Sequence, residues 1–324
     1  MRRRDFITLV GSAAAAWPFS LRAQEAGRTY RIGGMSPSPR TAPYIAAILD
    51  ELGRSGFIEG QNLTIDWRDY GPRIDLISEF AADFAKAQVD VILALGEPAI
   101  RAAQRATATI PILGSADDMV GSRLVNSLAR PGGNTTGISI LATELDGKRQ
   151  QILTEAVPGL RRMAVLADSK ITALPQLKAL QDAARARGVD LSIYEIARPE
   201  EITAAIDAAK ASDVAALNVL ASPILGRSRP IIMQRVAALR LPTIYQWPEA
   251  AEEGGFVAYG PRLVETFREL MTPQLVKLLL GAKAADLPIE QPTKFELVIN
   301  LKTAKALGLT IPESFLLRAD KVIE

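Results

Sequence analysis

Short runs of β-branched and aliphatic residues alternate with segments of helical periodicity from residue 30 almost to the end of the chain. The clearest run, residues 89–95, is apolar at every position except Asp90, as expected for a strand buried on both faces of a sheet. Residues 42–55 carry apolar side chains three and four positions apart, which predicts a helix. Strands that alternate with helices in this way indicate βαβ units and a parallel sheet.

The pattern divides into two similar series. The first predicts strands and helices in turn at residues 31–36, 42–55, 63–67, 74–87, 89–95, 98–106, 110–114, 120–129 and 137–140. The second predicts them at residues 145–156, 162–167, 175–187, 190–196, 199–211, 214–220, 230–239, 243–245 and 256–259, then a long helix at 263–280, a strand at 295–299 and a short tail. We therefore expect an α/β fold of two doubly wound, Rossmann-like lobes with a cleft between them. The first lobe is expected to hold residues 28–138 and about 260–290, and the second residues 139–259 and about 291–324.

The first 23 residues have the pattern of an export signal. A basic start is followed at residues 7–19 by an apolar, alanine-rich run that is short for a membrane span of about 20 residues. Arg3 and Arg4, with a spacer, Phe and an aliphatic residue after them, resemble a twin-arginine signal, although an ordinary secretory signal also fits. We expect cleavage near Ala23 and a periplasmic protein without stable membrane insertion. Because no Cys follows the run, we expect no lipid anchor.

The chain has no Cys and no His among its 324 residues. This excludes disulfides, thiol catalysis, Cys/His zinc sites and every catalytic arrangement that needs an imidazole. The formal charge of +2 is too close to balance to indicate a nucleic-acid partner. Four arginines and one aspartate lie in the predicted signal, so the rest of the chain carries about −1. Because the sequence also lacks a P-loop, a nucleophile elbow and a dinucleotide fingerprint, we expect no cofactor, no metal and no enzyme activity.

Polar segments follow most of the predicted strands, and ligands of open parallel sheets bind beyond the carboxyl ends of the strands. Several of these segments lead directly into helices, whose N-terminal N–H groups can hold a carboxylate. The same residue types are ordinary helix N-caps, but their concentration around one cleft favours ligand binding. The candidates from these segments are Ser36, Ser38, Gly96, Glu97, Pro98, Ser115, Asp117, Asp168 and Ser222. A metal site at Asp117 and Asp118 is disfavoured, because adjacent side chains at a helix start point in different directions.

Three aromatic residues, Tyr245, Trp247 and Tyr259, fall close together in a sequence with only 6% aromatic residues. They lie near the predicted passage between the lobes, where aromatic rings can cover an apolar or ring-bearing ligand. Core packing is the alternative for each of them. Tyr44, on the helix that follows Ser38, is a candidate by the same argument.

Several stretches together resemble one family, the periplasmic substrate-binding proteins of ABC transporters, in the branch that includes tryptophan- and tyrosine-uptake-like proteins. The stretches are ELGRSGFIEGQN (51–62), VDVI (89–92), ATATIPI (106–112), SLARPGGNTTG (127–137), GKR (147–149) and LPIEQPTKFELVINLKTA (287–304). The resemblance implies the type I binding-protein architecture, in which three crossovers form a hinge. It also implies an amino acid or similar small organic ligand, delivered to a membrane permease that a separate ATPase powers.

The sequence departs from the family pattern at three expected cleft positions. Gly96-Glu97-Pro98 stands where the family often has Gly-Thr-Pro, and a Glu there would repel a carboxylate and attract an ammonium or hydroxyl group. The segments at residues 167–170 and 246–248 are also altered. These changes leave the fold inference intact and weaken the inference about which ligand binds.

A solute receptor, expected to be a monomer, is the leading hypothesis for function. A sugar-sensing repressor of the same architecture would need a DNA-binding headpiece, which a 23-residue start cannot form. A secreted carboxylate-dependent hydrolase is the alternative, since it needs only a pair of acidic groups facing each other across the cleft.

Overall fold

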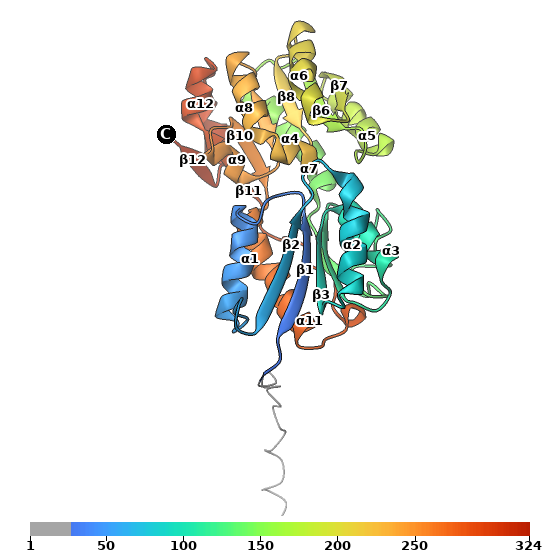
Figure 1. Ribbon diagram of the computed structural model, residues 1–324. Helices are drawn as coiled ribbons and strands as arrows, with labels where there is room; N and C mark the ends of the chain where they lie inside the picture. Colours follow the sequence, from blue (N-terminus) through green and yellow to red (C-terminus); the bar gives the residue numbers. More distant parts are fainter. Residues whose placement is uncertain (1–26) are drawn as a thin grey trace, which may run out of the picture.

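The computed structural model describes residues 27–324, which form two α/β lobes joined end to end (Figure 1). Each lobe contains one sheet of mainly parallel strands with helices against it. The prediction of two doubly wound α/β lobes is therefore confirmed. The predicted export signal lies outside the described residues. Within residues 27–324, every helix is too short or too polar to cross a bilayer.

The first lobe holds a five-stranded sheet in the order β2-β1-β3-β4-β5, in which all neighbouring strands are parallel. Its strands are β1 (Tyr30–Ser36), β2 (Leu63–Asp69), β3 (Val91–Leu95), β4 (Ile112–Ala116) and β5 (Thr135–Ser139). The helical segments between them are α1 (Pro43–Arg54), η1 (Ile74–Leu76), α2 (Ile77–Lys86) and α3 (Glu97–Ala106). Helix α1 covers one face of the sheet, whereas α2 and α3 cover the other (Figure 1).

The second lobe holds a seven-stranded sheet in the order β12-β11-β10-β9-β8-β6-β7. Its strands are β6 (Arg162–Asp168), β7 (Asp190–Ile196), β8 (Ala216–Val219), β9 (Thr243–Tyr245), β10 (Val257–Gly260), β11 (Glu296–Asn300) and β12 (Lys321–Ile323). The helical segments are α4 (Ala142–Ala156), α5 (Leu174–Arg185), η2 (Pro199–Glu201), α6 (Ile202–Ala211), α7 (Pro223–Arg227), α8 (Arg229–Ala238), α9 (Pro248–Glu252), α12 (Leu301–Ala306) and α13 (Glu313–Leu316). Only the β10–β11 pair of this sheet is antiparallel, because the chain enters β11 from the first lobe.

The chain passes between the lobes three times. The passages lie between β5 and α4, between β10 and α10 (Leu263–Thr266), and between η4 (Ala284–Asp286) and β11. After the second passage, Phe267, Met271 and Leu275 return to the first lobe and join the apolar cluster that includes Ile45 and Ile48 of α1. Each lobe therefore contains segments from both halves of the chain.

The helix predicted at residues 120–129 is absent, and this prediction is wrong. The segment forms turns instead. One carboxylate oxygen of Asp118 accepts the N–H groups of Val120 (3.1 Å) and Gly121 (2.7 Å), and Arg123 takes a left-handed backbone conformation with φ of 54°. A side chain that binds nearby backbone N–H groups competes with the helical hydrogen-bond pattern, and a left-handed residue ends that pattern.

The helix predicted at residues 263–280 is divided. Helix α10 is followed by a π-helical turn, η3 (Phe267–Met271), and then by α11 (Thr272–Leu279). Pro273 has no N–H to donate, and the Thr272 hydroxyl donates instead to the Phe267 carbonyl at 3.0 Å. The expected short tail is also more structured than predicted, because β12 adds to the edge of the second sheet beside β11.

Candidate functional site

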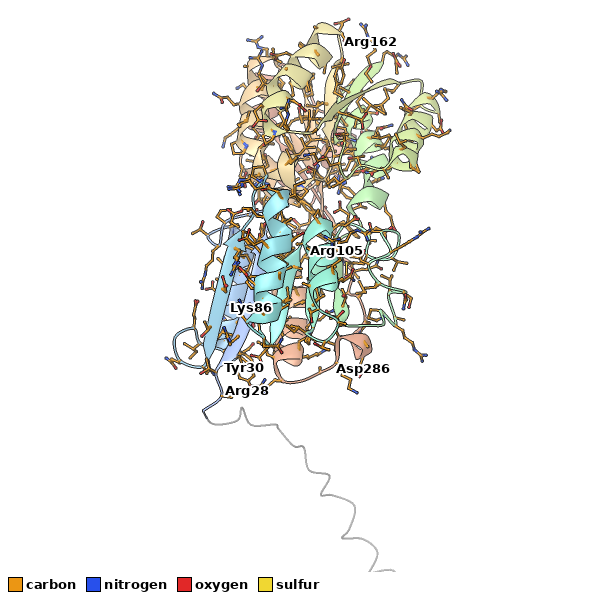
Figure 2. The ribbon with its side chains drawn as sticks, turned by 45° about the vertical axis from the view of Figure 1, so that its right-hand side comes forward. Arg28, Tyr30, Lys86, Arg105, Arg162 and Asp286 are labelled. Carbon is orange, nitrogen blue, oxygen red and sulfur yellow. The ribbon has the colours of Figure 1, made fainter. Side chains whose placement is uncertain are left out.

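All strands of the two sheets except β11 and β12 have their carboxyl ends toward the place where the lobes meet, which we call the junction. In Figure 2, Tyr30 at the start of β1 and Arg162 at the start of β6 lie at opposite extremes of the molecule. Both strands therefore run inward, as do the strands parallel to them. The polar segments that follow these strands are thus brought to one region, as expected for a ligand site of open α/β sheets.

Three of the predicted site residues of the first lobe lie together at the end of β1. The buried Ser36 hydroxyl accepts the Ser38 N–H at 3.0 Å. Burial raises the pKa of the Tyr44 phenol, while hydrogen bonds with the Ser38 and Ser36 hydroxyls oppose that rise. The Tyr44 ring also packs against Phe267, with ring centroids 5.0 Å apart. The hydroxyl groups of Ser36, Ser38 and Tyr44 therefore lie close together, beside the packed rings of Tyr44 and Phe267.

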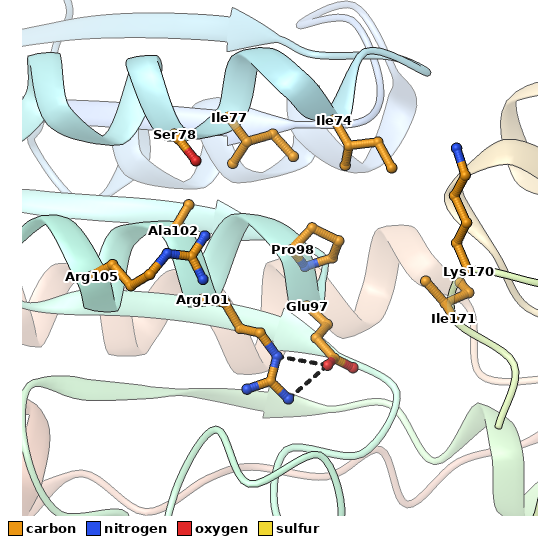
Figure 3. Close-up of a pocket in the computed structure, with 10 residues that line it drawn as sticks. All are labelled: Ile74, Ile77, Ser78, Glu97, Pro98, Arg101, Ala102, Arg105, Lys170 and Ile171. Atoms are coloured by element: carbon orange, nitrogen blue, oxygen red, sulfur yellow. Dashed lines mark hydrogen bonds and ion pairs between the residues drawn. The ribbon is translucent and has the colours of Figure 1, made fainter.

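Glu97 begins α3, and its charge is already compensated within the lobe. One of its carboxylate oxygens accepts a hydrogen bond from Arg101 Nε at 2.8 Å (Figure 3). The other oxygen accepts one from the Ser122 hydroxyl at 2.9 Å. These partners reduce the expected attraction of Glu97 for a ligand ammonium group.

The turn before Glu97 requires glycine at position 96. Gly96 has a φ of 101°, and a Cβ there would lie 2.7 Å from the Tyr70 hydroxyl. Ser115, on the neighbouring β4, is buried, and its carbonyl accepts the Gly96 N–H.

A cluster of two buried charged side chains and one partly buried carboxylate lies where the first passage enters the second lobe. We call Asp117, Asp146 and Arg149 the hinge cluster. Arg149 Nη1 donates to Asp146 at 2.8 Å, and Arg149 Nε donates to the Tyr259 carbonyl beside the second passage, also at 2.8 Å. Gln176 donates to the other Asp146 oxygen at 2.6 Å. The side chains of Asp146 and Arg149 are almost fully buried.

Electrostatics make the hinge cluster sensitive to protonation. Burial raises the pKa of the partly buried Asp117 to about 7, and the negative charge of Asp146 adds to the rise while Arg149 opposes it. Burial likewise raises the pKa of Asp146 and lowers that of Arg149. Sequence reasoning proposed Asp117 but missed Asp146 and Arg149. Asp146 and Arg149 are three positions apart on a predicted helix, and this spacing could have predicted their ion pair because such residues share a helix face.

The second lobe brings Asp168 and Ser222 together. Asp168 ends β6 and is buried, and one of its oxygens accepts the Ser222 hydroxyl at 2.8 Å. The other accepts the Lys170 backbone N–H at 3.0 Å. The Ser222 hydroxyl also accepts the Leu225 N–H and so caps α7. Both residues therefore have structural partners at the junction. Ser222 has the helix-capping role that the sequence predicts as the alternative to ligand binding.

The three clustered aromatic residues do not lie together. Tyr245 is 2% exposed in an apolar core of the second lobe, against Gly255, and burial raises the pKa of its hydroxyl. Tyr259 packs on the other apolar cluster of that lobe, with its ring 6.4 Å from Phe295. Trp247 follows β9 of the second lobe but packs against the apolar cluster of the first lobe, so it contacts that lobe across the junction.

An ion pair that the sequence did not predict joins the lobes beside Ser36. Arg227, at the end of α7, donates from Nη1 to the Pro37 carbonyl at 2.8 Å and to the Asp69 carboxylate at 2.9 Å. The pair is partly exposed. It links the segment after β1 and the end of β2 to the second lobe.

A cavity of about 320 Å³ opens at the edge of the junction (Figure 3). Most of its wall comes from α2 and α3, including Pro98 at the start of α3, and Lys170 and Ile171 of the second lobe close one end. Its volume is at the lower limit of ordinary ligand pockets. In the part of the chain that the structure describes, no group of three acidic residues could hold a metal ion, and Asp118 is used in the turn described above.

Two α/β lobes with inward-pointing strands, three passages between them and polar groups at the junction define a two-lobed binding protein of the type I architecture. The sequence profile described as ABC transporter substrate binding protein matches residues 42–323. The chain therefore belongs to the ABC transporter substrate-binding protein family, as the resemblance implied. This membership gives no support to the hydrolase alternative.

Individual proteins show the same relationship. The chain is 27% identical over 274 residues to the tyrosine-binding protein of Clostridioides difficile, covering 82% of this chain and 75% of the relative. A conserved domain protein from Vibrio cholerae has the same fold, with a TM-score of 0.82 at 23% identity over 91% of this chain and 99% of the other. A Streptococcus pneumoniae ABC domain in complex with L-Trp has a TM-score of 0.80 at 24% identity, covering 91% of this chain and all of the other.

Proposed function

We propose that the protein captures an amino acid or a similar small organic molecule between its lobes and delivers it to the membrane permease of an ABC importer. Family membership supports the transport role. The relative named as tyrosine-binding and the solved structure with L-Trp support an amino acid as the ligand class. The single observation that carries the proposal is the meeting of polar groups from both sheets at the junction.

The proposed ligand contacts follow from the chemistry of the two sides. Ser36, Ser38 and Tyr44, at and beyond the carboxyl end of β1, offer hydroxyls that can donate to a ligand carboxylate. Asp168 offers a carboxylate on the opposite side, whose remaining lone pairs can accept an ammonium group. We also propose Gly96, Ser115, Asp117, Ser222 and Trp247 as lining groups, and we assign Tyr245 and Tyr259 only an indirect role, through packing.

We further propose that the protein releases its ligand chemically unchanged, needs no cofactor and acts as a monomer. The absence of His and Cys from the sequence supports binding without catalysis. The basic and apolar pattern of residues 1–23 supports export by the twin-arginine or the general secretory route, with the protein free in the periplasm.

A thermal-shift screen tests the proposed function. The purified protein is heated with L-tyrosine, L-tryptophan and other amino acids, and a ligand at 100 times its Kd should stabilise the folded state by about 2.7 kcal/mol. Asp168→Asn should weaken the shift, whereas Asp190→Asn, an exposed change at the far end of the same sheet, should leave it unchanged. The proposal fails if no amino acid or related compound raises the melting temperature.

A further inference from the structure

The cavity between α2 and α3 lies outside the group of strand-end side chains just described, and we call it the helix groove. Ile74, Ile77 and Ser78 form one wall, and Pro98, Ala102 and Arg105 of α3 form the other. In Figure 3 these side chains face each other across the space between the two helices, while Lys170 and Ile171 approach from the second lobe at the end beside Pro98. The groove therefore runs along the outer face of the first lobe and is closed by the second.

Two cations of the groove lack partners. Neither the guanidinium of Arg105 nor the ammonium of Lys170 has a hydrogen bond or ion pair with any residue of the described part of the chain. Arg101 differs, because it is paired with Glu97, and both of these side chains turn to the side of α3 away from α2 (Figure 3). The groove thus has two positive charges with which no residue of 27–324 pairs.

The two unpaired cations stand at opposite ends of an apolar surface. Arg105 follows Pro98 by seven positions on the same helix, about 10 Å at the helical rise. Lys170 lies beyond Pro98 at the other end (Figure 3). Between them the surface is formed by Ile74, Ile77, Pro98 and Ala102. An apolar carbon chain suits this surface, and an anionic group at each end suits the two cations.

We propose that the helix groove is a second binding site, for a small organic dianion such as an α,ω-dicarboxylate, whose carboxylates pair with Arg105 and Lys170. Because Lys170 and Ile171 belong to the second lobe, a bound dianion bridges the lobes. Occupancy of the groove therefore favours the lobe arrangement in which the second lobe closes it.

The test measures binding of succinate, adipate, suberate and sebacate by isothermal titration calorimetry, with octanoate as the monoanion of matched length. We expect the longer dicarboxylates to bind saturably, and suberate to bind at least about tenfold more tightly than octanoate. Arg105→Ala and Lys170→Ala should each weaken suberate about tenfold, the effect of losing one charge-assisted hydrogen bond. Both side chains are exposed, so neither change should disturb folding.

Two control variants distinguish binding in the helix groove from a general effect of removing a cation and from binding at the junction. Lys86→Ala removes an exposed cation from the last turn of α2, outside the groove, and should leave suberate affinity unchanged. Tyr44→Phe alters the strand-end group at the junction and should also leave it unchanged. The inference is overturned if no dicarboxylate binds saturably, if octanoate binds as well as suberate, or if Lys86→Ala weakens binding as much as Arg105→Ala does. A loss in Tyr44→Phe equal to that in Arg105→Ala also overturns it, because the dianion would then occupy the junction. The proposed transport function does not depend on any of these outcomes.

Discussion

Asp117 of the hinge cluster should make the stability of the protein depend on pH. Its pKa lies near 7 in the folded state, against an ordinary value of 3.8. Between about pH 4 and pH 7 the folded protein therefore holds a proton that the unfolded chain has lost. Folded stability must fall as the pH rises through this window and then become independent of Asp117 above it. Each unit of pKa corresponds to 1.36 kcal/mol, so the full effect is up to about 4 kcal/mol.

Asp117→Asn isolates this contribution, because an amide resembles the protonated carboxyl in size and cannot ionise. Near pH 4 the variant and the original protein should have similar free energies of unfolding. At pH 7.5 the variant should be more stable by up to about 4 kcal/mol, since it avoids the cost of a buried charge beside Asp146.

Urea unfolding followed by circular dichroism at several pH values between 4 and 8 measures this difference. Asp50→Asn, an exposed change on α1, is the matched control and should follow the original protein at every pH. If the difference between Asp117→Asn and the original protein is the same at pH 4.5 and pH 7.5, Asp117 does not change its protonation in this range. The reasoning from burial and from the charge of Asp146 would then be wrong.

Three further changes have defined outcomes. Arg149→Leu leaves Asp146 buried without its cation and should cost about 3–5 kcal/mol in the free energy of unfolding. Arg227→Ala removes a partly exposed pair between the lobes, so it should cost less than about 1 kcal/mol but increase the radius of gyration measured by small-angle X-ray scattering. Gly137→Ala places a Cβ 1.8 Å from the Gly114 carbonyl oxygen at a φ of 143°, and should cost about 3 kcal/mol or more by thermal unfolding.

Two of these changes have a matched comparison, and the third has an outcome that would contradict it. Adding Asp146→Asn to Arg149→Leu should recover part of the loss, because the uncompensated charge is gone. Gly147→Ala, in an open position on α4, should stabilise the protein by about 0.5–1 kcal/mol, in contrast to Gly137→Ala. An unchanged radius of gyration for Arg227→Ala would show that this pair does not hold the lobes together.

Most strands of both lobes could be predicted, because a parallel strand buried on both faces is a continuous apolar run in the sequence, as at β3. The helix predicted at residues 120–129 also rested on the pattern of apolar residues, and here the pattern gave the wrong result. Val120, Leu124 and Leu128 have helical spacing, but the local pattern does not show that Asp118 binds the following N–H groups or that Arg123 is left-handed. Strand β12 could not be predicted because its three residues gain their structure from β11, a partner outside the segment.

The candidate site was predictable in position and not in detail. The rule that polar segments follow parallel strands located Ser36, Asp117 and Asp168 at the junction. It could not show which partners they would find there. Asp117 lies beside charges contributed by a different lobe, and the Arg227 pair depends on how the two lobes meet. Contacts of this kind are set by tertiary packing and leave no local signature.

The three passages between the lobes also constrain how the chain can be made. The apolar cluster of the first lobe requires Phe267, Met271 and Leu275, and the sheet of the second lobe is completed only by β11 and β12 near the end of the sequence. During synthesis, therefore, neither core can close until almost the whole chain has been translated, and the lobes cannot fold one after the other as independent units. A chain cut short before η3 would lack Phe267, Met271 and Leu275 of the first lobe as well as β11 and β12 of the second, so such a nascent or truncated form would expose apolar surface from each lobe at once.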